Sequence, residues 1–332
     1  MKSDNKILTI ILPIRVTEDR INLIEQLDYI NLDKNNKNIE FIVVDDGSSL
    51  FYREKIEKKC NILNIKYIFV NTENRDFSIA RARNRGAESS STPFIMFQDI
   101  DMMPYKGFYK ELINEIKIQN LFNKPTHFIM IGTIYLTQKG TKEYKPHLKN
   151  LFIDKLLLND KEYIDRYSTA TSLIIINKDF FLSLNGYDEK FEKWGHEDID
   201  FNCRIILKNN LVKLPEEFIL DEKNFNNIFE YKGWKSIYRL YGDRTFIKGI
   251  VLFHSWHPIS IDNDYYANRT KNKNYFHTKL KGYLKEYKQK SGYVLSKESI
   301  LFDRYKYALS PNNRLKCKSF FYAIYYKLKK FF

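Results

Sequence analysis

The feature that most constrains the fold of this chain is an alternation of short β-rich runs with segments of helical period in its N-terminal part. The β-rich runs predict strands at Ile7–Leu12, Ile39–Val44, Lys66–Val70 and Phe94–Phe97. The apolar residues between these runs recur with a helical period, which predicts helices at Glu18–Tyr29, Arg53–Ile62 and Ile79–Glu88. Strands that alternate with helices are typical of doubly wound α/β folds. We therefore predict an α/β fold in which helices flank a mostly parallel sheet.

The later part of the chain departs from this regular alternation. Its pattern predicts a strand at Ser172–Ile176, a short helix at Lys178–Leu184, a helix that begins near Glu197 and a strand at Gly249–Phe253. From about Asp262 onward the chain is polar and rich in Lys, Asn and Tyr. We expect this last part to form a helical C-terminal extension in several pieces.

Composition limits the classes of binding partner and the cellular compartment that we expect for this chain. The chain has 332 residues, of which 43% are hydrophobic, and this is enough for a large core. The net charge of +14 favours contact with phosphates, an acidic membrane or nucleic acid, but general use of Lys and Asn would give the same excess. The three cysteines, Cys60, Cys203 and Cys317, lie far apart, which argues against a disulfide framework or a zinc site. We therefore expect a reducing, cytoplasmic environment.

Two aspartates follow the predicted strand Phe94–Phe97. Side chains at positions i and i+2 of a strand point the same way, so we expect Asp99 and Asp101 to converge on one point. Two converging carboxylates need a positive partner, and a hard divalent cation that also binds a phosphate is suitable. The alternative is a pair of solvated loop aspartates, because such a motif is short.

Other charged residues lie near the same edge of the predicted sheet, where ligands of doubly wound folds bind. Asp45 and Asp46 end the strand at Ile39–Val44 and are candidates to bind a ribose or a base. Arg81 and Arg85 are four residues apart on a helix and are candidates to bind a diphosphate. The alternative for each arginine is a solvated basic face.

A second Asp-Ile-Asp occurs at Asp198–Asp200, and its geometry differs because it lies on a predicted helix. Residues i and i+2 of a helix do not face each other, so this pair cannot form the same chelate. Complementing the helix dipole is one alternative, above all for Asp200. Trp194, however, offers a flat face on which a sugar can stack, and Gly195 lets a ligand approach the backbone. A carboxylate beside them could take a proton from a hydroxyl group, which indicates sugar transfer from a nucleotide to an alcohol.

The motifs resemble those of the GT-A glycosyltransferases, especially the animal β-1,4-galactosyltransferases and the bacterial chondroitin-polymerase-type modules. The resemblance covers roughly residues 7–257, and the motifs occur in the family order. They are Leu12-Pro13-Ile14-Arg15, Val43-Val44-Asp45-Asp46-Gly47-Ser48, Ala80-Arg81-Ala82-Arg83-Asn84-Arg85-Gly86, Phe97-Gln98-Asp99-Ile100-Asp101 with Pro104, Asn185-Gly186-Tyr187 through Trp194-Gly195-His196-Glu197-Asp198, and Phe253-His254-Ser255.

The resemblance implies a role for each matching residue. It implies Mn²⁺ or Mg²⁺ held by Asp101 and His254, with Asp99 near both the metal and the ribose. It implies Asp198 as the catalytic base and Glu197 as a sugar-binding partner. The remaining donor-binding and acceptor-binding residues would be Pro13, Arg15, Asp45, Asp46, Arg81 and Arg85 for the donor, and Trp194, Gly195 and His196 for the acceptor.

Three positions depart from the family pattern. His196 replaces a glycine, so the sugar pocket would differ in shape, and Val251 replaces a metal-binding methionine of the galactosyltransferases. His257 is a possible substitute for His254 as the metal ligand. Because Val251 stands in place of that methionine, the metal would have one protein ligand fewer than in the galactosyltransferases.

The resemblance implies an inverting, metal-dependent enzyme that moves a Gal, GalNAc or GlcNAc type of sugar from a UDP-sugar to a hydroxyl group of a glycan or lipid-linked glycan. The glycosyltransferase domain would span residues 1–260, with a nucleotide-sugar half at 1–104 and an acceptor and catalytic half at 105–260, followed by the extension at 261–332. Heavy use of Lys, Asn and Ile favours a bacterium with an AT-rich genome, and hence capsule or lipooligosaccharide synthesis.

Three alternatives remain. A nucleotidyltransferase could also use a metal-binding aspartate pair, and a non-catalytic relative could bind sugars without transferring them. Nucleic-acid binding would need a basic, aromatic surface, whereas the basic residues here are dispersed or concentrated in the tail. We therefore expect no nucleic-acid partner.

The C-terminal tail, Asn313–Phe332, interleaves lysines with aromatic residues and is too short and too charged to span a membrane. We interpret it as an amphipathic helix that lies on the anionic inner face of the cytoplasmic membrane. A helix packed on the domain is the alternative.

Overall fold

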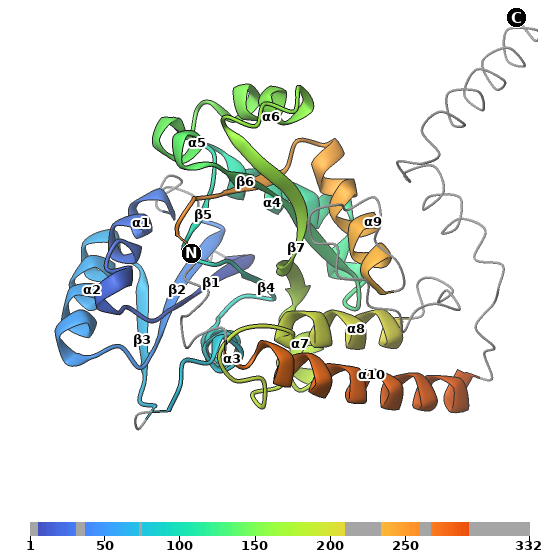
Figure 1. Ribbon diagram of the computed structural model, residues 1–332. Coiled ribbons are helices and arrows are strands. Elements are labelled where there is room, and N and C mark those ends of the chain that lie inside the picture. Colours follow the sequence, from blue (N-terminus) through green and yellow to red (C-terminus); the bar gives the residue numbers. More distant parts are fainter. Residues whose placement is uncertain (1–5, 31–36, 73–74, 210–233, 259–266, 292–332) are drawn as a thin grey trace, which may run out of the picture.

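The computed structural model describes residues 6–30, 37–72, 75–209, 234–258 and 267–291 (Figure 1). A single sheet runs through this part of the chain in the strand order β3-β2-β1-β4-β7-β6-β8-β5. The strands are β1 (Leu8–Ile14), β2 (Ile39–Asp46), β3 (Lys66–Val70), β4 (Phe94–Phe97), β5 (Met102–Met103), β6 (Phe128–Leu136), β7 (Ile164–Asn177) and β8 (Val251–His254). The predicted α/β class with helices flanking a sheet is confirmed.

The N-terminal half of the sheet follows the prediction closely. Strands β1 to β4 are the four predicted strands, and they pair in parallel, with β1 between β2 and β4. Every residue of β1 is buried, because helices cover both faces of a parallel sheet. The helices of this half are α1 (Leu23–Ile30), α2 (Leu50–Leu63) and α3 (Ile79–Ser89). The predicted helix from Glu18 is interrupted, since a short 3-10 turn at Glu18–Arg20 precedes α1.

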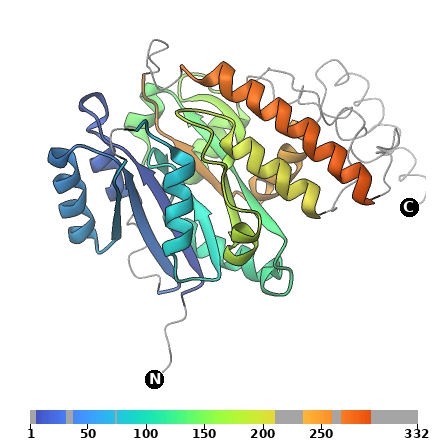
Figure 2. The same ribbon diagram turned by 90° about the horizontal axis from the view of Figure 1, so that it is seen from below.

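Helix α3 packs against β1 and β2 on one face of the sheet (Figure 2). A Cβ atom on Gly86 would stand 2.3 Å from Cγ2 of Ile11 and 3.2 Å from a methyl group of Val44. The glycine therefore lets the helix backbone rest directly on β1 and β2. This close approach matters for function, because α3 carries the arginines of the predicted site.

The C-terminal half of the sheet is mixed, which corrects the expectation of a mostly parallel sheet for this part. Strand β7 runs antiparallel to both β4 and β6, β8 is parallel to β6, and β5 is antiparallel to β8. The sequence pattern did not identify β6, because its largely apolar run shows no clear alternation of apolar and polar residues. The helices here are α4 (Phe108–Ile118), α5 (Gln138–Glu143), α6 (Lys149–Leu157), α7 (Lys178–Ser183), α8 (Glu197–Asn209), α9 (Trp234–Ile247) and α10 (Arg269–Ser291).

Two hydrophobic cores lie on opposite faces of the sheet. Neighbouring residues of β1 point to opposite faces, so that Ile10 belongs to one core and Ile11 to the other. The second core also contains Phe276 and Leu280 of α10. The predicted helical pieces after residue 262 therefore include one long helix that packs on the domain.

The remaining predictions concern the C-terminal tail, membrane-spanning helices and the cysteines. The tail Asn313–Phe332 lies outside them. Within the described part, none of the helices combines the length and the apolar character that a bilayer crossing requires. Cys60 and Cys203 are buried free thiols.

Candidate active site

The two aspartates after β4 have different partners, whereas strand geometry predicted that they converge on one point. Strand β4 ends at Phe97, and the chain then turns, with the Met102 amide donating to the Asp99 carbonyl over 3.0 Å. The alternation rule for strands therefore does not apply at these positions. Asp99 binds Arg83 through an Nη2–Oδ1 distance of 2.9 Å, whereas Asp101 faces two histidines. The two carboxylates have separate partners.

Asp101, His254 and His257 form a cluster that could hold a metal ion. The Asp101 Oδ2 atom lies 3.6 Å from Nε2 of His254 and 3.6 Å from Nε2 of His257, and one ligand atom of each residue lies within 4.8 Å of the others. The pairing of β5 with β8 sets this arrangement, because Met102 lies opposite His254 and the Ser255 amide donates to the Asp101 carbonyl over 2.9 Å. The sequence left His254 and His257 as alternatives, and the structure brings both to Asp101.

The chemistry of this cluster fits a divalent metal ion. Oδ1 of Asp101 is buried and has no hydrogen-bond partner within the described residues, so a ligand oxygen is left over. Burial lowers the pKa of His254, which keeps the imidazole in the neutral form that ligates metals. The His254 ring also stacks on Tyr135, with a centroid distance of 4.7 Å, and this contact fixes its orientation. One carboxylate with two imidazoles is a donor set that binds divalent transition metals.

Arg83 connects the two acidic motifs, although the sequence pattern assigned no role to this residue. Its side chain is only 1% exposed, and its guanidinium lies 2.9 Å from Oδ1 of Asp99 and 3.0 Å from Oε1 of Glu197. The available signal was its place on α3, where it shares the buried face with Ala80 and Ala87. A charged residue on a buried helical face must have charged partners. Arg83 therefore brings the turn after β4 and the start of α8 together.

Glu197 and Asp198 begin α8 in different environments. Glu197 is 6% exposed, and burial together with the neighbouring Asp198 raises the pKa of its carboxyl group, while Arg83 opposes the rise. Asp198 is only half-buried, and its Oδ1 atom accepts a hydrogen bond of 2.8 Å from the Ile199 amide. The more accessible carboxylate is thus the predicted base, and the buried one is anchored to Arg83.

The loop that precedes α8 has an unusual backbone. Lys193, Gly195 and His196 all have positive φ angles, of 57°, 102° and 76° respectively. A glycine adopts this conformation without cost, and histidine is among the residues that tolerate it. A Cβ atom on Gly195 would meet nothing within 4 Å, so space at this position is open. The guanidinium of Arg269 lies 5.4 Å from the centre of the Trp194 ring.

The predicted donor-binding aspartates make internal contacts. Asp46 accepts hydrogen bonds from Nε and Nη2 of Arg81, each 2.6 Å long, and one of 2.7 Å from the Ser78 amide. Asp45 accepts hydrogen bonds from the Ser48 amide over 2.9 Å and from the Tyr67 hydroxyl over 2.8 Å. Both aspartates are buried, and they hold the loop after β2 against α3 and β3.

The other predicted donor-binding residues occupy different positions. Pro13 is buried in β1, and Arg15 donates a hydrogen bond of 3.1 Å to the carbonyl of Arg75. Arg85 is half exposed and pairs with Glu88 one turn along α3. Arg81 and Arg85 therefore have different partners, although they lie one turn apart on α3. Arg81 binds Asp46, and Arg85 binds Glu88. The donor-binding roles of these residues stay predictions.

Comparison with known proteins connects this site to one family. The sequence model described as "Glycosyltransferase like family 2" matches residues 9–282, which is most of the chain. The chain therefore belongs to this family, and it is a glycosyltransferase by class. Chondroitin synthase from Pasteurella multocida (strain Pm70) is 25% identical over 202 residues, which make up 53% of this chain and 20% of that protein. The match thus spans a fifth of the length of chondroitin synthase.

Solved structures of S. aureus TarS are also similar to this chain. TarS 1–349 in complex with UDP-GlcNAc has 20% sequence identity and a TM-score of 0.41, over 61% of this chain and 54% of that one. The same fragment in complex with UDP has 17% identity and a TM-score of 0.40, over 61% of this chain and 56% of that one.

Proposed function

We propose that the protein is an inverting, metal-dependent glycosyltransferase that moves a hexose or N-acetylhexosamine of the Gal, GalNAc or GlcNAc type from a UDP-sugar to a glycan hydroxyl group. The observation that carries this proposal is the cluster of Asp101, His254 and His257 near the buried Arg83 bridge between Asp99 and Glu197. The UDP-sugar as donor is supported by the motifs of the chain and by its family.

The metal would be held by Asp101, His254 and His257, with Mn²⁺ or Mg²⁺ as the ion. A bound divalent cation would stabilise negative charge on the departing diphosphate. Asp99, which is about a quarter exposed and is neutralised by Arg83, would orient the donor without repelling its phosphates. Asp99 itself is proposed as a contact to the ribose and as a neighbour of the metal.

Asp198 is proposed as the general base. It would remove the proton from the acceptor hydroxyl as this oxygen attacks the anomeric carbon on the face opposite the leaving diphosphate, which inverts the configuration. The partial exposure of Asp198 supports contact with an acceptor from solvent. Trp194 and the open space at Gly195 would receive the acceptor sugar, and Glu197 would bind a sugar hydroxyl from its anchored position.

The biological setting is part of the same proposal. The acceptor would be a glycan or lipid-linked glycan of a bacterial capsule or lipooligosaccharide, extended in the cytoplasm at the inner face of the membrane. The basic, aromatic tail at 313–332 would bind that anionic surface.

The proposal is tested by incubating the protein with a panel of UDP-sugars, with and without Mn²⁺, and by measuring the release of UDP. We expect metal-dependent release from one donor. His254→Ala should abolish this release, and His147→Ala, a change of an exposed histidine outside the cluster, should leave it intact. Release that is insensitive to EDTA would contradict the metal site. Release of pyrophosphate from UTP and a sugar 1-phosphate, without release of UDP from any UDP-sugar, would indicate a nucleotidyltransferase.

A further inference from the structure

Helix α10 lies alongside α8, the helix that begins with Glu197 and Asp198 (Figures 1 and 2). Its apolar side chains Phe276, Leu280 and Leu284 are all nearly completely buried and belong to the core on that face of the sheet. This packing alone would stabilise the fold. The polar contacts of α10, however, are concentrated on the residues that lead into the proposed catalytic segment.

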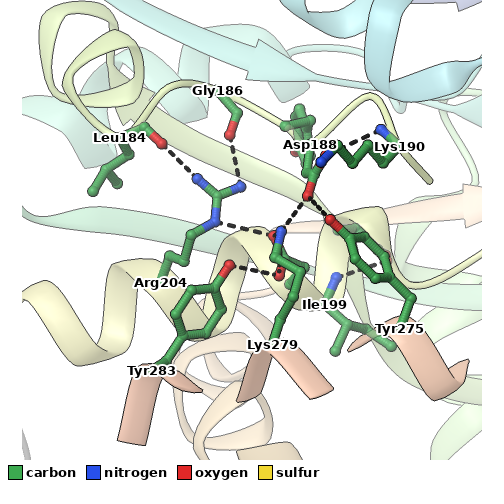
Figure 3. Close-up of polar contacts among 12 residues, drawn as sticks. Leu184, Gly186, Asp188, Lys190, Ile199, Arg204, Tyr275, Lys279 and Tyr283 are labelled. Atoms are coloured by element: carbon green, nitrogen blue, oxygen red, sulfur yellow. Dashed lines mark hydrogen bonds and ion pairs between the residues drawn. The ribbon is translucent and has the colours of Figure 1, made fainter. Parts of the chain in front are cut away.

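The first of these contacts is made to Asp200, a carboxylate with no exposed surface. Nζ of Lys279 lies 3.1 Å from this carboxylate, and the Tyr283 hydroxyl donates to its Oδ1 atom over 3.0 Å. Arg204 of α8 supplies a third partner, with Nε 3.0 Å from Oδ2. A buried carboxylate requires such partners, and two of the three come from α10 (Figure 3).

Lys279 also binds Asp188, in the loop between α7 and α8. The hydroxyl of Tyr275 donates a second hydrogen bond, of 2.9 Å, to the same Asp188 carboxylate. One ammonium group therefore joins the loop to α8, because it lies between the carboxylates of Asp188 and Asp200 (Figure 3). Burial opposes ionisation of Asp188, but the hydrogen bonds of Lys279 and Tyr275 lower its pKa.

The rest of the loop is held by further bonds from the same two helices. Arg204 donates to the carbonyl oxygens of Leu184 and Gly186, over 2.5 Å and 2.7 Å (Figure 3). The Asn272 side chain of α10 donates to the carbonyl oxygens of Glu192 and Trp194, over 2.9 Å and 3.1 Å. The loop is thus fixed at its start by α8 and at its end by α10, immediately before Glu197.

We propose that α10 is a positioning element of the active site, and that Lys279 is the positioning residue that sets the loop 188–196 and the start of α8 relative to each other. This inference rests on the proposed function, because the positioned groups are Trp194 and the base Asp198. Backbone in the left-handed region, as at Lys193 and His196, persists only where surrounding contacts hold it. The α10 contacts provide that constraint on one side of the loop, and a β-bridge between Ser78 and Lys193 provides it on the other.

The matched test compares Lys279→Met with Lys281→Met, a change of an exposed lysine on the same helix. The Mn²⁺-dependent release of UDP from the UDP-sugar that the panel identifies is measured as kcat, and Mn²⁺-dependent UDP binding is measured by calorimetry. We expect Lys279→Met to lower kcat about tenfold to a hundredfold, since a displacement of the base by about 1 Å costs that much. UDP binding should not change, because Asp101 and the two histidines lie at β5 and β8. Lys281→Met should behave like the unaltered protein in both assays.

Hydrogen exchange measured by mass spectrometry gives a second readout that does not need an active enzyme. Lys279→Met should speed amide exchange in residues 186–200 and leave strands β1 to β4 unchanged. Lys279→Arg keeps the charge and should recover part of the protection and part of kcat. If Lys279→Met does not fold, Tyr283→Phe removes a single hydroxyl group from Asp200 and should show the same pattern more weakly.

The outcomes separate the two proposals. Equal kcat and equal exchange in Lys279→Met and Lys281→Met would overturn the positioning role while the glycosyltransferase assignment stands. A loss of stability with kcat unchanged per folded molecule would make Lys279 merely structural and would also overturn it. Absence of both UDP release and Mn²⁺-dependent UDP binding in the unaltered protein would refute the proposed function, and faster exchange at 186–200 in Lys279→Met would still support the contact of α10 with the loop.

Discussion

Removal of the positive charge at Arg83 is the perturbation whose effect follows most directly from the structure. Arg83→Met keeps much of the length of the side chain but leaves Asp99 and Glu197 without their shared partner. Asp99 is 27% exposed and can regain water, whereas Glu197 has a side chain only 7% exposed and cannot. The expected cost therefore arises mainly at Glu197.

The loss in free energy of unfolding that Glu197 can cause has an upper limit, because a buried carboxyl group that loses its counter-charge takes up a proton. Protonation at pH 7 of a group whose ordinary pKa is 4.5 costs about 3.4 kcal/mol, at about 1.36 kcal/mol for each pH unit. Since burial raises the pKa of Glu197 to about 8 in the unaltered protein, most of this cost is already present at pH 7, and the loss on removal of Arg83 should fall far below that limit. We expect the free energy of unfolding to fall by about 1–2 kcal/mol at pH 7, from the lost hydrogen bonds to Asp99 and Glu197.

The protonation of Glu197 also sets the direction in which the stability of Arg83→Met changes with pH. In Arg83→Met the folded protein keeps a proton on Glu197 above about pH 8, where the folded unaltered protein releases it and the unfolded chain has already lost it. Its stability deficit should therefore be nearly constant below about pH 7 and should grow by up to about 1.36 kcal/mol for each pH unit above about pH 8. Urea unfolding at a series of pH values measures this directly.

Two further variants test whether the loss of stability in Arg83→Met arises from the charge of Glu197. Arg85→Met removes an arginine from the same helix whose exposed partner is Glu88, and it should cost less than about 1 kcal/mol at every pH. Glu197→Gln combined with Arg83→Met removes the titrating group, so the double variant should lose the pH dependence. A deficit that is independent of pH, or that persists unchanged in the double variant, would refute the reasoning.

Three other predictions follow from the site and its support. His257→Ala should weaken Mn²⁺ binding in calorimetry by at least about tenfold, as should His254→Ala, because both face Asp101; an effect of His254 alone would show that His257 is not a ligand. Asp198→Asn should abolish transfer while UDP binding persists, and turnover near the normal rate would disprove its role as the base. Gly86→Ala should lower the thermal unfolding temperature despite the gain in helix propensity, since its Cβ would meet Ile11 at 2.3 Å; an unchanged or higher value would contradict the close packing of α3.

Much of the fold could be predicted from local sequence patterns. Strands β1 to β4, the short helix α7 and the start of α8 at Glu197 lie where periodicity predicted them. Each depends on apolar spacing within a few residues, and each is bounded by residues that end regular structure. Strand β6 was missed, because a continuous apolar run fits a buried strand or a buried helix equally well.

The candidate site was accessible only in part. The sequence motifs identified Asp101 and His254, but the choice between His254 and His257 depended on the pairing of β5 with β8, which joins distant segments. The chain turns after β4, so that Asp99 pairs with Arg83 and Asp101 faces the histidines, which the rule for a continuing strand did not predict. No local sequence pattern could show that Asp99 would form an ion pair with Arg83.

By itself, the sequence determined the α/β class, the positions of the N-terminal strands along the chain and the identity of the acidic groups, because these properties follow from residues that are neighbours in the chain. Only the tertiary structure decided which charges meet. Arg83 became the bridge between Asp99 and Glu197 because Gly86 lets α3 rest on the sheet, and Lys279 reached Asp188 and Asp200 because α10 packs along α8. Pairing of buried charges depends on distance in space, and packing sets that distance across gaps of sixteen to more than a hundred residues.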